Sequence, residues 1–233
     1  MPNLNGRTFA VTGASGNLGR AVRDVLLRDG ANVVLLDRSD HSGSASTNPK
    51  QTLSLSGLDL TDTAAVGRAL DKAIARFGRI HGLVATIGAF SGGGTGSEDG
   101  WTVWDDMLTA NLKTTVAAVQ AIVPRLPREG GRIVTVGARP GLAGVKGLSA
   151  YSASKAAVLR LTESLSEELK HTGVTVNSVL PNIIDTPQNR EAMPDADHSR
   201  WVPAQDIAKV IAFLLSDSAR AVTGALIPVY GKS

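Results

Sequence analysis

The sequence Thr12-Gly13-Ala14-Ser15-Gly16-Asn17-Leu18-Gly19 joins two segments of different periodicity. Before it, Thr8–Thr12 is short and rich in apolar and β-branched residues, as in a buried strand. After it, apolar residues recur at helical spacing until Asp29-Gly30. Glycines permit a tight turn and let N–H groups at a helix start face a phosphate. A strand, a glycine-rich turn and a helix in this order predict a dinucleotide-binding α/β fold, with a purely structural turn as the alternative.

Short apolar strands and longer helical segments continue to alternate along the chain. Further strands are predicted at residues 31–37, 52–58, 82–87, 132–137, 174–180 and 225–229, and helices at 62–77, 104–125, 151–171 and 203–215. Near-continuous apolar strands joined through helices indicate a doubly wound, parallel α/β sheet of seven strands with helices on both faces. Because no linker or change of composition divides residues 1–233, we expect one domain.

The composition excludes several classes of function. The chain has no cysteine, which excludes disulfides, thiolate metal sites and a cysteine nucleophile. Its 233 residues carry a net charge of +3 without a basic cluster, so we expect no nucleic-acid partner. Apolar runs are much shorter than the roughly 20 residues of a membrane span, the N-terminus lacks a signal-peptide pattern, and the histidines lack metal-ligand spacing. We expect a cytoplasmic protein that binds no metal and acts on a small molecule.

Asp37 ends the second predicted strand, about 20 residues beyond the glycine turn. A carboxylate at this position accepts hydrogen bonds from an adenosine ribose and repels a 2′-phosphate, which favours NAD over NADP. Arg38 follows directly and leaves NADP as an alternative. A solvated aspartate at a strand end is the structural alternative.

Tyr151 and Lys155 are spaced four residues apart and therefore share one face of a helix. A tyrosine with its ordinary pKa of about 10 needs roughly 4 kcal/mol of phenolate stabilisation to exchange protons near neutral pH. A neighbouring ammonium group can supply it. Taken alone, the pair is more easily explained by chance, because any helix can carry tyrosine and lysine at this spacing.

Taken together, these residues resemble the short-chain dehydrogenase/reductase family. The glycine turn, Asp59-Leu60, Asn111, Tyr151 with Lys155, and Pro181 followed by Thr186 occur in the family's order along essentially the whole chain. The resemblance implies that Tyr151 is the general acid/base and that Lys155 holds the nicotinamide ribose and lowers the pKa of Tyr151. It also implies that Asn111 positions a water for proton relay.

The resemblance further implies a set of residues that bind the cofactor. Asp59 and Leu60 would border the adenine, whereas Ile184 and Thr186 would meet the carboxamide. The implied set consists of Gly13, Ser15, Gly16, Asn17, Leu18, Gly19, Asp37, Arg38, Asp59, Leu60, Gly88, Tyr151, Lys155, Ile184 and Thr186. Members of the family have the strand order 3-2-1-4-5-6-7 and are commonly dimers or tetramers, so we expect a homodimer or homotetramer.

Three positions depart from the family pattern. Asn17 replaces a glycine, and because asparagine tolerates positive φ better than most residues, we expect the turn to survive. Ala85-Thr86-Ile87-Gly88 replaces the usual Asn-Asn-Ala-Gly, so the hydrogen bonds of the asparagine side chains must be replaced or lost. Ala138 stands where the family has a catalytic serine, and Gly137 before it carries no hydroxyl either.

The missing serine directs attention to one branch of the family. Losing one donor to a substrate carbonyl costs on the order of 3 kcal/mol, so the substrate needs less polarisation or the site is inactive. Dihydropteridine reductases resemble this chain because they work from tyrosine and lysine without that serine. Residues 185–190, 193–197 and Trp201 look like theirs, within a substrate lid expected at about 183–203. Phe90 and Gly92–Gly94 resemble their aromatic, glycine-rich loop.

Three hypotheses for the function follow. The first is an NAD(P)-dependent oxidoreductase that transfers hydride between nicotinamide and an electron-poor ring or carbonyl compound, with Tyr151 as acid/base. The second is an alcohol dehydrogenase or ketone reductase. The third is a non-catalytic NAD-binding sensor. Arg139, next to the position of the missing serine, could reach an anionic substrate, although a solvated loop arginine is the simpler interpretation.

Overall fold

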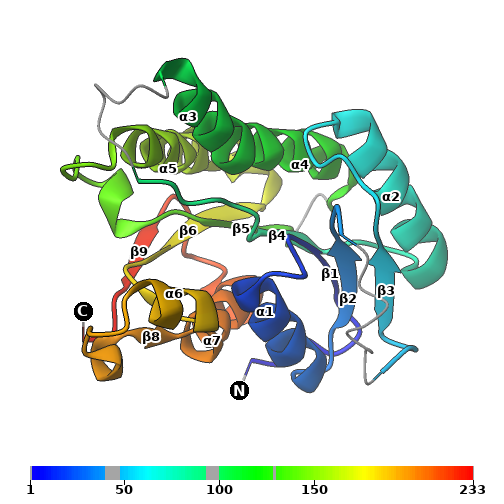
Figure 1. Ribbon diagram of the computed structural model, residues 1–233. Helices are drawn as coiled ribbons and strands as arrows, with labels where there is room; N and C mark the ends of the chain where they lie inside the picture. Colours follow the sequence, from blue (N-terminus) through cyan, green and yellow to red (C-terminus); the bar gives the residue numbers. More distant parts are fainter. Residues whose placement is uncertain (1, 40–47, 93–99, 128–129, 233) are drawn as a thin grey trace.

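A parallel sheet forms the centre of the molecule. The computed structural model describes residues 2–39, 48–92, 100–127 and 130–232. Its seven-stranded sheet has the order β3-β2-β1-β4-β5-β6-β9, and every neighbouring pair is parallel. The strands are β1 Thr8–Thr12, β2 Asn32–Leu36, β3 Thr52–Leu55, β4 Gly82–Ala85, β5 Arg132–Val136, β6 Thr175–Pro181 and β9 Leu226–Val229 (Figure 1). The predicted fold class and strand order are confirmed, with β9 as the seventh strand of this sheet.

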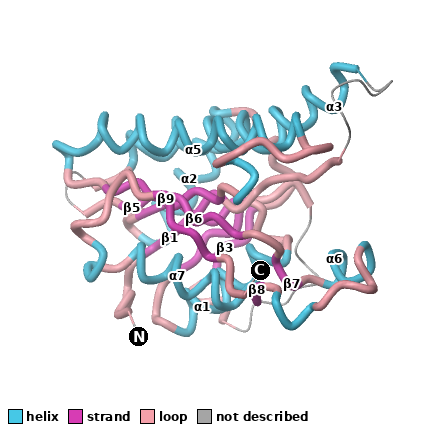
Figure 2. The backbone as a smooth tube through the Cα atoms, turned by 90° about the vertical axis from the view of Figure 1, so that its left-hand side faces the viewer, coloured by secondary structure: helices cyan, strands magenta, loops and turns pink. Residues whose placement is uncertain are grey.

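Helices cover both faces of the sheet, as Figures 1 and 2 show from two directions. One layer contains α2 Thr63–Phe77, α3 Gly100–Met107, α4 Thr114–Ile122 and α5 Ser149–Leu169; the other contains α1 Asn17–Arg28 and α7 Ala204–Leu215. Alternate side chains of each strand pack against the two helical layers, since successive side chains point to opposite faces of the sheet. Phe9 and Val11 of β1 pack in the core with α1 and α7, whereas Ala10 packs in the core with α2 and α4.

Several predicted boundaries shift where local chemistry changes. β3 ends at Leu55, before Gly57 turns the chain at a φ of 70°. The predicted helix at 104–125 is replaced by α3, a π-helical segment Leu108–Lys113, α4 and a 3-10 turn Val123–Arg125. Pro124 explains the last change, because proline has no N–H to donate within a helix. The π-helical segment is a local widening of the helix, and such segments often occur at functional sites.

The chain segment that connects β6 to α7 forms a small second sheet. Its strands β7 Ile184–Asp185 and β8 Val202–Pro203 are parallel, and between them lie α6 Pro187–Ala192 and a 3-10 turn His198–Arg200. This segment was predicted to be a substrate lid, and its two strands were not predicted. Two residues are too few to produce a periodic pattern.

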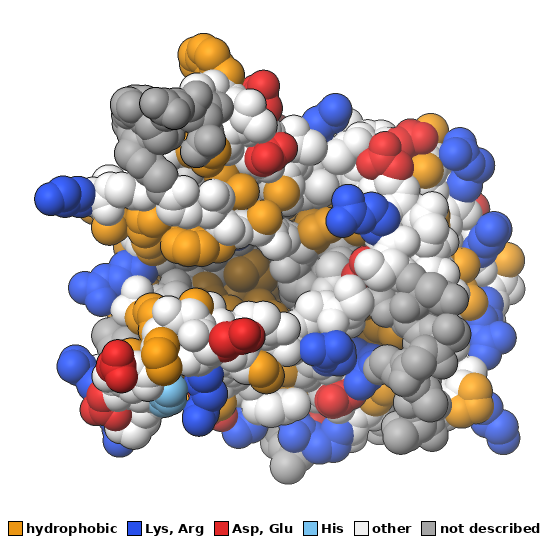
Figure 3. Space-filling view, in the orientation of Figure 1, with side chains coloured by type: hydrophobic (Ala, Val, Ile, Leu, Met, Phe, Trp, Pro, Cys, Tyr) orange, Lys and Arg blue, Asp and Glu red, His pale blue; other side chains and the backbone are white. Residues whose placement is uncertain are grey.

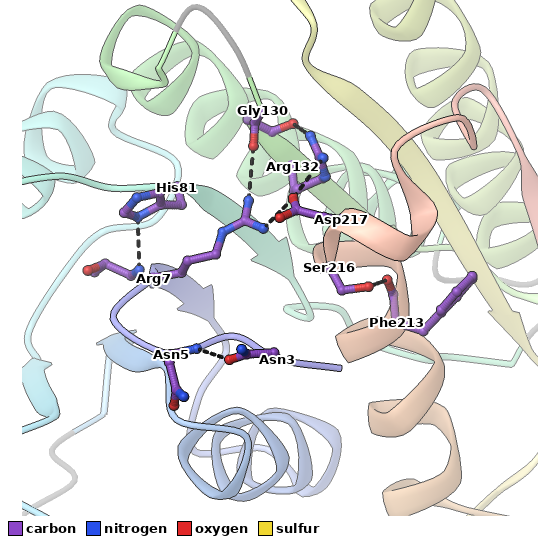
Figure 4. Close-up of polar contacts among 11 residues, drawn as sticks. Asn3, Asn5, Arg7, His81, Gly130, Arg132, Phe213, Ser216 and Asp217 are labelled. Carbon is purple, nitrogen blue, oxygen red and sulfur yellow. Dashed lines mark hydrogen bonds and ion pairs between the residues drawn. The ribbon is translucent and has the colours of Figure 1, made fainter. Parts of the chain in front are cut away.

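A polar cluster closes the edge of the sheet at which β1, β4 and β5 begin (Figure 4). Arg7 Nη1 lies 3.0 Å from Asp217 Oδ1, and Arg7 Nη2 donates to Gly130 O at 3.0 Å. Buried Arg132 contacts the same carboxylate at 3.5 Å. His81 Nδ1 accepts a hydrogen bond from Thr8 N at 3.0 Å, so this ring nitrogen is unprotonated.

His81 should make the stability of the protein dependent on pH. Burial, followed by the charges of Arg7 and Arg79, lowers the pKa of His81. The unfolded chain therefore binds this proton more readily, so stability is full above the ordinary histidine pKa of about 6.5 and falls as the pH drops below it. The midpoint of urea unfolding, followed by circular dichroism between about pH 7.5 and 5, measures this loss.

The variant His81→Gln should lose less stability on acidification than the wild type, because it has no imidazole to protonate. His171→Gln is the matched control, since His171 is exposed and no ring contact or hydrogen bond of its side chain is recorded in the described part of the chain. If the urea-unfolding midpoint of His81→Gln fell with pH as steeply as that of His171→Gln, the acid-induced loss of stability could not be assigned to His81.

Candidate functional site

The candidate site lies at the carboxyl edge of the sheet. The strand order reverses between β1 and β4, and ligands of open α/β sheets bind in the crevice at such a point. A cavity of about 700 Å³ opens beside it, with walls from the residues that follow β4, β5 and β6 and from α5 and α6. Figure 3 shows a hollow on this side of the molecule, with hydrophobic side chains gathered along its walls.

The glycine turn follows β1 and leads into α1. Gly13 has a φ of 65°, and a Cβ added there would lie 2.8 Å from the Cα of Ile87. A Cβ on Gly19 would lie 2.3 Å from Gly13 O, so neither position accepts a side chain. Gly16 caps α1 without a side-chain hydrogen bond, and the first turn of α1 has no acidic residue. The first N–H groups of α1 thus suit the pyrophosphate of a dinucleotide.

Asn17 behaves differently from the expectation. Every described residue with positive φ is a glycine, and Asn17 is the first residue of α1. The turn survives because Gly13 takes the left-handed conformation, so the explanation based on the tolerance of asparagine is wrong. The Asn17 side chain instead donates from Nδ2 to Gln188 Oε1 at 2.7 Å and thereby links the turn to α6.

Asp37 is held beside the turn. Its Oδ2 accepts hydrogen bonds from Ser15 N and Ser15 Oγ, both at 2.9 Å, and its Oδ1 accepts one from Ser39 N at 3.1 Å. The Asp37 side chain is buried, whereas Arg38 is exposed. The structure thus brings together the glycine turn and the carboxylate that sequence analysis assigned to the ribose.

The predicted adenine-binding pair divides into an exposed and a buried residue. Asp59 is exposed, and Leu60 is buried. Asp59 Oδ1 accepts hydrogen bonds from Thr61 Oγ1 at 2.7 Å and Thr61 N at 2.8 Å, and these bonds lower the pKa of Asp59. The carboxylate is therefore ionised and already engaged with its own turn.

Asn111 and Lys155 lie close to Gly88, and Tyr151 lines the same cavity. Tyr151 and Lys155 of α5 both line the cavity, and Lys155 Nζ donates to Val136 O at 3.0 Å. Asn111 lies in the π-helical segment, where its Oδ1 accepts from Ala89 N at 3.0 Å. A Cβ on Gly88 would lie 2.7 Å from Asn111 Oδ1 and 3.2 Å from Lys155 Nζ. Glycine at position 88 therefore permits the amide oxygen and the ammonium group each to lie close to the backbone of this residue.

Burial is the main cause of the shifted pKa values of Tyr151 and Lys155 in α5. It raises the pKa of Tyr151 to about 12 and lowers the pKa of Lys155 to about 8. The ammonium of Lys155 donates to a backbone carbonyl, and no hydrogen bond between it and the phenol is recorded in the described part of the chain. The expected lowering of the Tyr151 pKa by Lys155 is therefore not found in this structure, where burial acts in the opposite direction. Tyr151 is protonated at neutral pH.

The positions that depart from the family pattern have clear structural consequences. Ala138 is buried and lines the cavity. Gly137 precedes it, and a Cβ there would lie 2.5 Å from Leu159 Cδ2, so a larger residue at this position would have to displace the buried Leu159 side chain. Thr86 Oγ1 donates to Thr12 O at 2.6 Å and thus ties the end of β4 to the end of β1. This bond is one that an asparagine side chain at the same position could otherwise make.

Residues 183–203 form one side of the cavity. Ile184, Asn189 and Met193 line it. Thr186 does not; its Oγ1 accepts from Asn189 N at 3.1 Å and caps α6. Arg190 pairs with Asp185 through two contacts of 2.6 and 2.8 Å that fix the start of the same helix.

Some contacts of the site had only weak sequence signals. The ring of Phe90 lies edge-on to Tyr151 with the centroids 5.0 Å apart, and Gly93 and Gly94 of its predicted loop lie outside the described residues. Ser154 Oγ accepts a hydrogen bond from Asn111 Nδ2 at 3.0 Å. Its position three residues after Tyr151, on the same helical face, was the available signal. Val145 and Leu148 also line the cavity, but loop residues produce no periodicity.

The parallel sheet, the glycine turn and the crevice define a Rossmann-type α/β protein. The sequence pattern described as short chain dehydrogenase matches residues 7–197. The chain belongs to the short-chain dehydrogenase/reductase family.

Characterised relatives cover nearly the whole chain. The 3-oxoacyl-acyl-carrier-protein reductase of Escherichia coli is 32% identical over 249 residues, which cover 98% of each chain. The cyclohexanol dehydrogenase of Rhodococcus sp. is 31% identical and covers 98% of this chain and 96% of its own. A blue fluorescent protein from a metagenomic library, solved in complex with NADPH, is 32% identical with a TM-score of 0.86, covering 99% of this chain and 98% of its own.

Metal ligation and membrane insertion have no support in the described residues. Within residues 2–39, 48–92, 100–127 and 130–232, no group of three or more His, Asp or Glu side chains could hold a metal ion. Among the helices of the same ranges, none is long and apolar enough to cross a membrane.

Proposed function

We propose that the protein is an NAD(P)-dependent oxidoreductase of the dihydropteridine-reductase-like type, which reduces an electron-poor ring or carbonyl compound. The observation that carries the proposal is that Tyr151 and buried Lys155 line one cavity beside the glycine turn. In this proposal residues 1–233 form one domain, and residues 183–203 act as the substrate lid. The relatives' reductase and dehydrogenase names support the reaction class.

The residues present fit a nicotinamide dinucleotide. The uncapped start of α1 would hold the pyrophosphate, Asp37 the adenosine ribose and Lys155 the nicotinamide ribose. When bound, the reduced nicotinamide supplies the hydride. Gly88 leaves room beside Lys155, and Ile184 contributes an apolar wall on the other side of the cavity.

Tyr151 would supply the proton from its phenolic oxygen. A group that donates a proton must hold it before the reaction, and burial raises the pKa of Tyr151 to about 12, which keeps the phenol protonated. Asn111, whose side chain bonds Ala89 and Ser154, would hold the backbone beside the proposed nicotinamide position in place.

The absence of a hydroxyl group at Ala138 favours a substrate whose reacting group needs little polarisation by a hydrogen-bond donor. Without a hydroxyl at this position, a simple ketone loses one donor to its oxygen. A quinonoid dihydropterin is already a reactive hydride acceptor, because reduction restores aromatic character to its ring. Stopped-flow oxidation of NADH and NADPH by quinonoid dihydropterin, compared with a panel of simple ketones, tests this preference. Turnover of the ketones alone would reverse the ranking, and cofactor binding with no turnover would favour the sensor hypothesis.

Restoring the hydroxyl at position 138 should improve reduction of ketones selectively. In Ala138→Ser, kcat/KM for ketones should rise about tenfold, because the new donor can reach the carbonyl oxygen, while that for dihydropterin stays within about twofold. Steady-state kinetics on both substrate types measure the change. Ala143→Ser, in an exposed loop, is the control for adding a hydroxyl. Equal gains for both substrate types would contradict the argument from polarisation.

Asp37 should determine the choice of cofactor. In Asp37→Asn, the ratio of kcat/KM for NADPH to that for NADH should rise about tenfold, because the carboxylate no longer repels the 2′-phosphate. The ratio is measured at saturating substrate. Asp24→Asn, on the exposed side of α1, removes the same charge elsewhere and should leave the ratio unchanged. An unchanged ratio in Asp37→Asn would contradict the assignment of Asp37 to the ribose.

A further inference from the structure

The cavity is lined by cations and by no anion. Of the described residues that line it, Arg139 and Lys155 are basic, and none is an aspartate or glutamate. Lys155 is buried and donates to Val136 O, so it belongs to the inner part of the site. Arg139 is exposed and stands in the turn Arg139–Gly141 that follows β5.

The head group of Arg139 is held in place without a carboxylate. Its guanidinium carbon lies 5.2 Å from the centroid of the Tyr230 ring, an arrangement that attracts a cation to the ring face. Among the described residues Arg139 forms no ion pair, whereas Arg190 and Arg125 each make two contacts with one carboxylate. Stacking on a ring leaves the N–H groups at the edge of the guanidinium able to donate.

The remaining walls of the cavity indicate what the rest of a ligand would be. Phe90, Val145 and Met193 are 66%, 45% and 36% exposed, respectively, and all three line the cavity. Exposed apolar side chains gathered at one cavity mark a binding site for an apolar group. Leu148 and Pro140 extend the same surface. The lining thus combines an apolar surface with one arginine at its exposed side.

We propose that Arg139 is a specificity-determining residue that binds a carboxylate on an otherwise apolar or aromatic substrate. The inference rests on the proposed function and narrows its substrate class to anionic ring or carbonyl compounds. The planar guanidinium fork matches a carboxylate and forms charge-assisted hydrogen bonds with it. Lys155 adds a second positive charge to the same cavity, and the absence of anionic lining residues among those described removes competition for Arg139.

Binding of a matched pair of ligands tests the proposal without requiring turnover. The pair is 4-acetylbenzoate and 4-acetylbenzamide, which share an aromatic ketone and differ in charge. Isothermal titration calorimetry of each into the full-length protein with saturating NAD gives both dissociation constants. The acid should bind at least about tenfold more tightly than the amide. This preference should fall to about one in Arg139→Gln and persist in Arg220→Gln, which removes an exposed arginine outside the lining residues.

Arg139→Lys keeps the charge and should retain part of the preference, which gives a second measurement if Arg139→Gln does not fold. Equal affinities in the wild type, no binding of either compound up to about 10 mM, or an undiminished preference in Arg139→Gln would each overturn the proposal. Loss of the preference in Arg139→Lys would overturn the electrostatic explanation. Absence of NADH and NADPH oxidation with quinonoid dihydropterin and with the ketone panel, alongside a clear preference for the acid in calorimetry, would overturn the proposed function and leave this subsite in place.

Discussion

Replacing Tyr151 by Phe should lower kcat for hydride transfer about 10³-fold, because general acid catalysis contributes about 10² to 10⁴ and no other proton donor is assigned to the reaction. The variant keeps the aromatic ring that lies edge-on to Phe90, so the cavity wall should be preserved. The dissociation constant of NADH should stay within about threefold of the wild-type value, since the lost hydroxyl is one contact among many. Stopped-flow absorbance of NADH measures the rate, and fluorescence titration measures the affinity.

Tyr230→Phe is the matched control for Tyr151→Phe. It removes the phenolic oxygen of the other tyrosine in the chain, and Tyr230 contacts Arg139 but does not line the cavity. Its kcat should stay within about threefold of the wild-type value. Equal rates for Tyr151→Phe and the wild type would remove Tyr151 from the mechanism. A loss of NADH binding in Tyr151→Phe would show that the phenol acts mainly in cofactor binding.

The fold was largely predictable because its signals are repeated and local. The strand before the glycine turn is a short run of apolar and β-branched residues, typical of a strand buried on both faces, and the helix after it has apolar residues at the 3.6-residue period of an amphipathic helix. A strand followed by a helix recurs four more times along the chain, so each element supports the next. The predictions were wrong for some element boundaries, because Pro124 ends α4 early. They also missed β7 and β8, which are two-residue strands held by contacts between distant parts of the chain.

The candidate site was predictable where residue type and spacing carry chemistry. The spacing of Tyr151 and Lys155 indicated a shared helical face, and Asp37 was predicted at the end of a strand. Their place in one site with the glycine turn was implied by the family resemblance. The hydrogen bonds between Asn111, Ala89 and Ser154 depend on the packing of separate elements, and sequence spacing does not encode them. The direction of the Tyr151 pKa shift was also missed, since burial outweighs a lysine whose ammonium donates to Val136.

Gly88→Ala should produce the second large effect on activity, because the missing side chain of Gly88 leaves room for Asn111 and Lys155 beside the backbone at this position. A Cβ at position 88 would lie 2.7 Å from Asn111 Oδ1, closer than a carbon and an oxygen can normally approach. It would also lie 3.2 Å from Lys155 Nζ. Since φ of Gly88 is not positive, Gly88→Ala causes no backbone strain and acts through these displacements alone. We expect kcat/KM to fall at least about 100-fold, because a misplacement of about 1 Å costs this much.

The comparison between Gly88→Ala and Gly92→Ala isolates this effect. A Cβ on Gly92 would lie 3.9 Å from both Gly147 O and Leu148 Cδ2, which is ordinary contact, and its φ is not positive either. Gly92→Ala should therefore retain activity within about threefold. Gly92→Ala should unfold within a few degrees of the wild type, and Gly88→Ala should be the less stable of the two, because its Cβ displaces the buried Asn111 side chain. If Gly88→Ala were as active as Gly92→Ala, the close approach of Asn111 and of Lys155 to Gly88 would not matter for the reaction. A loss confined to Gly88→Ala would tie activity to that approach.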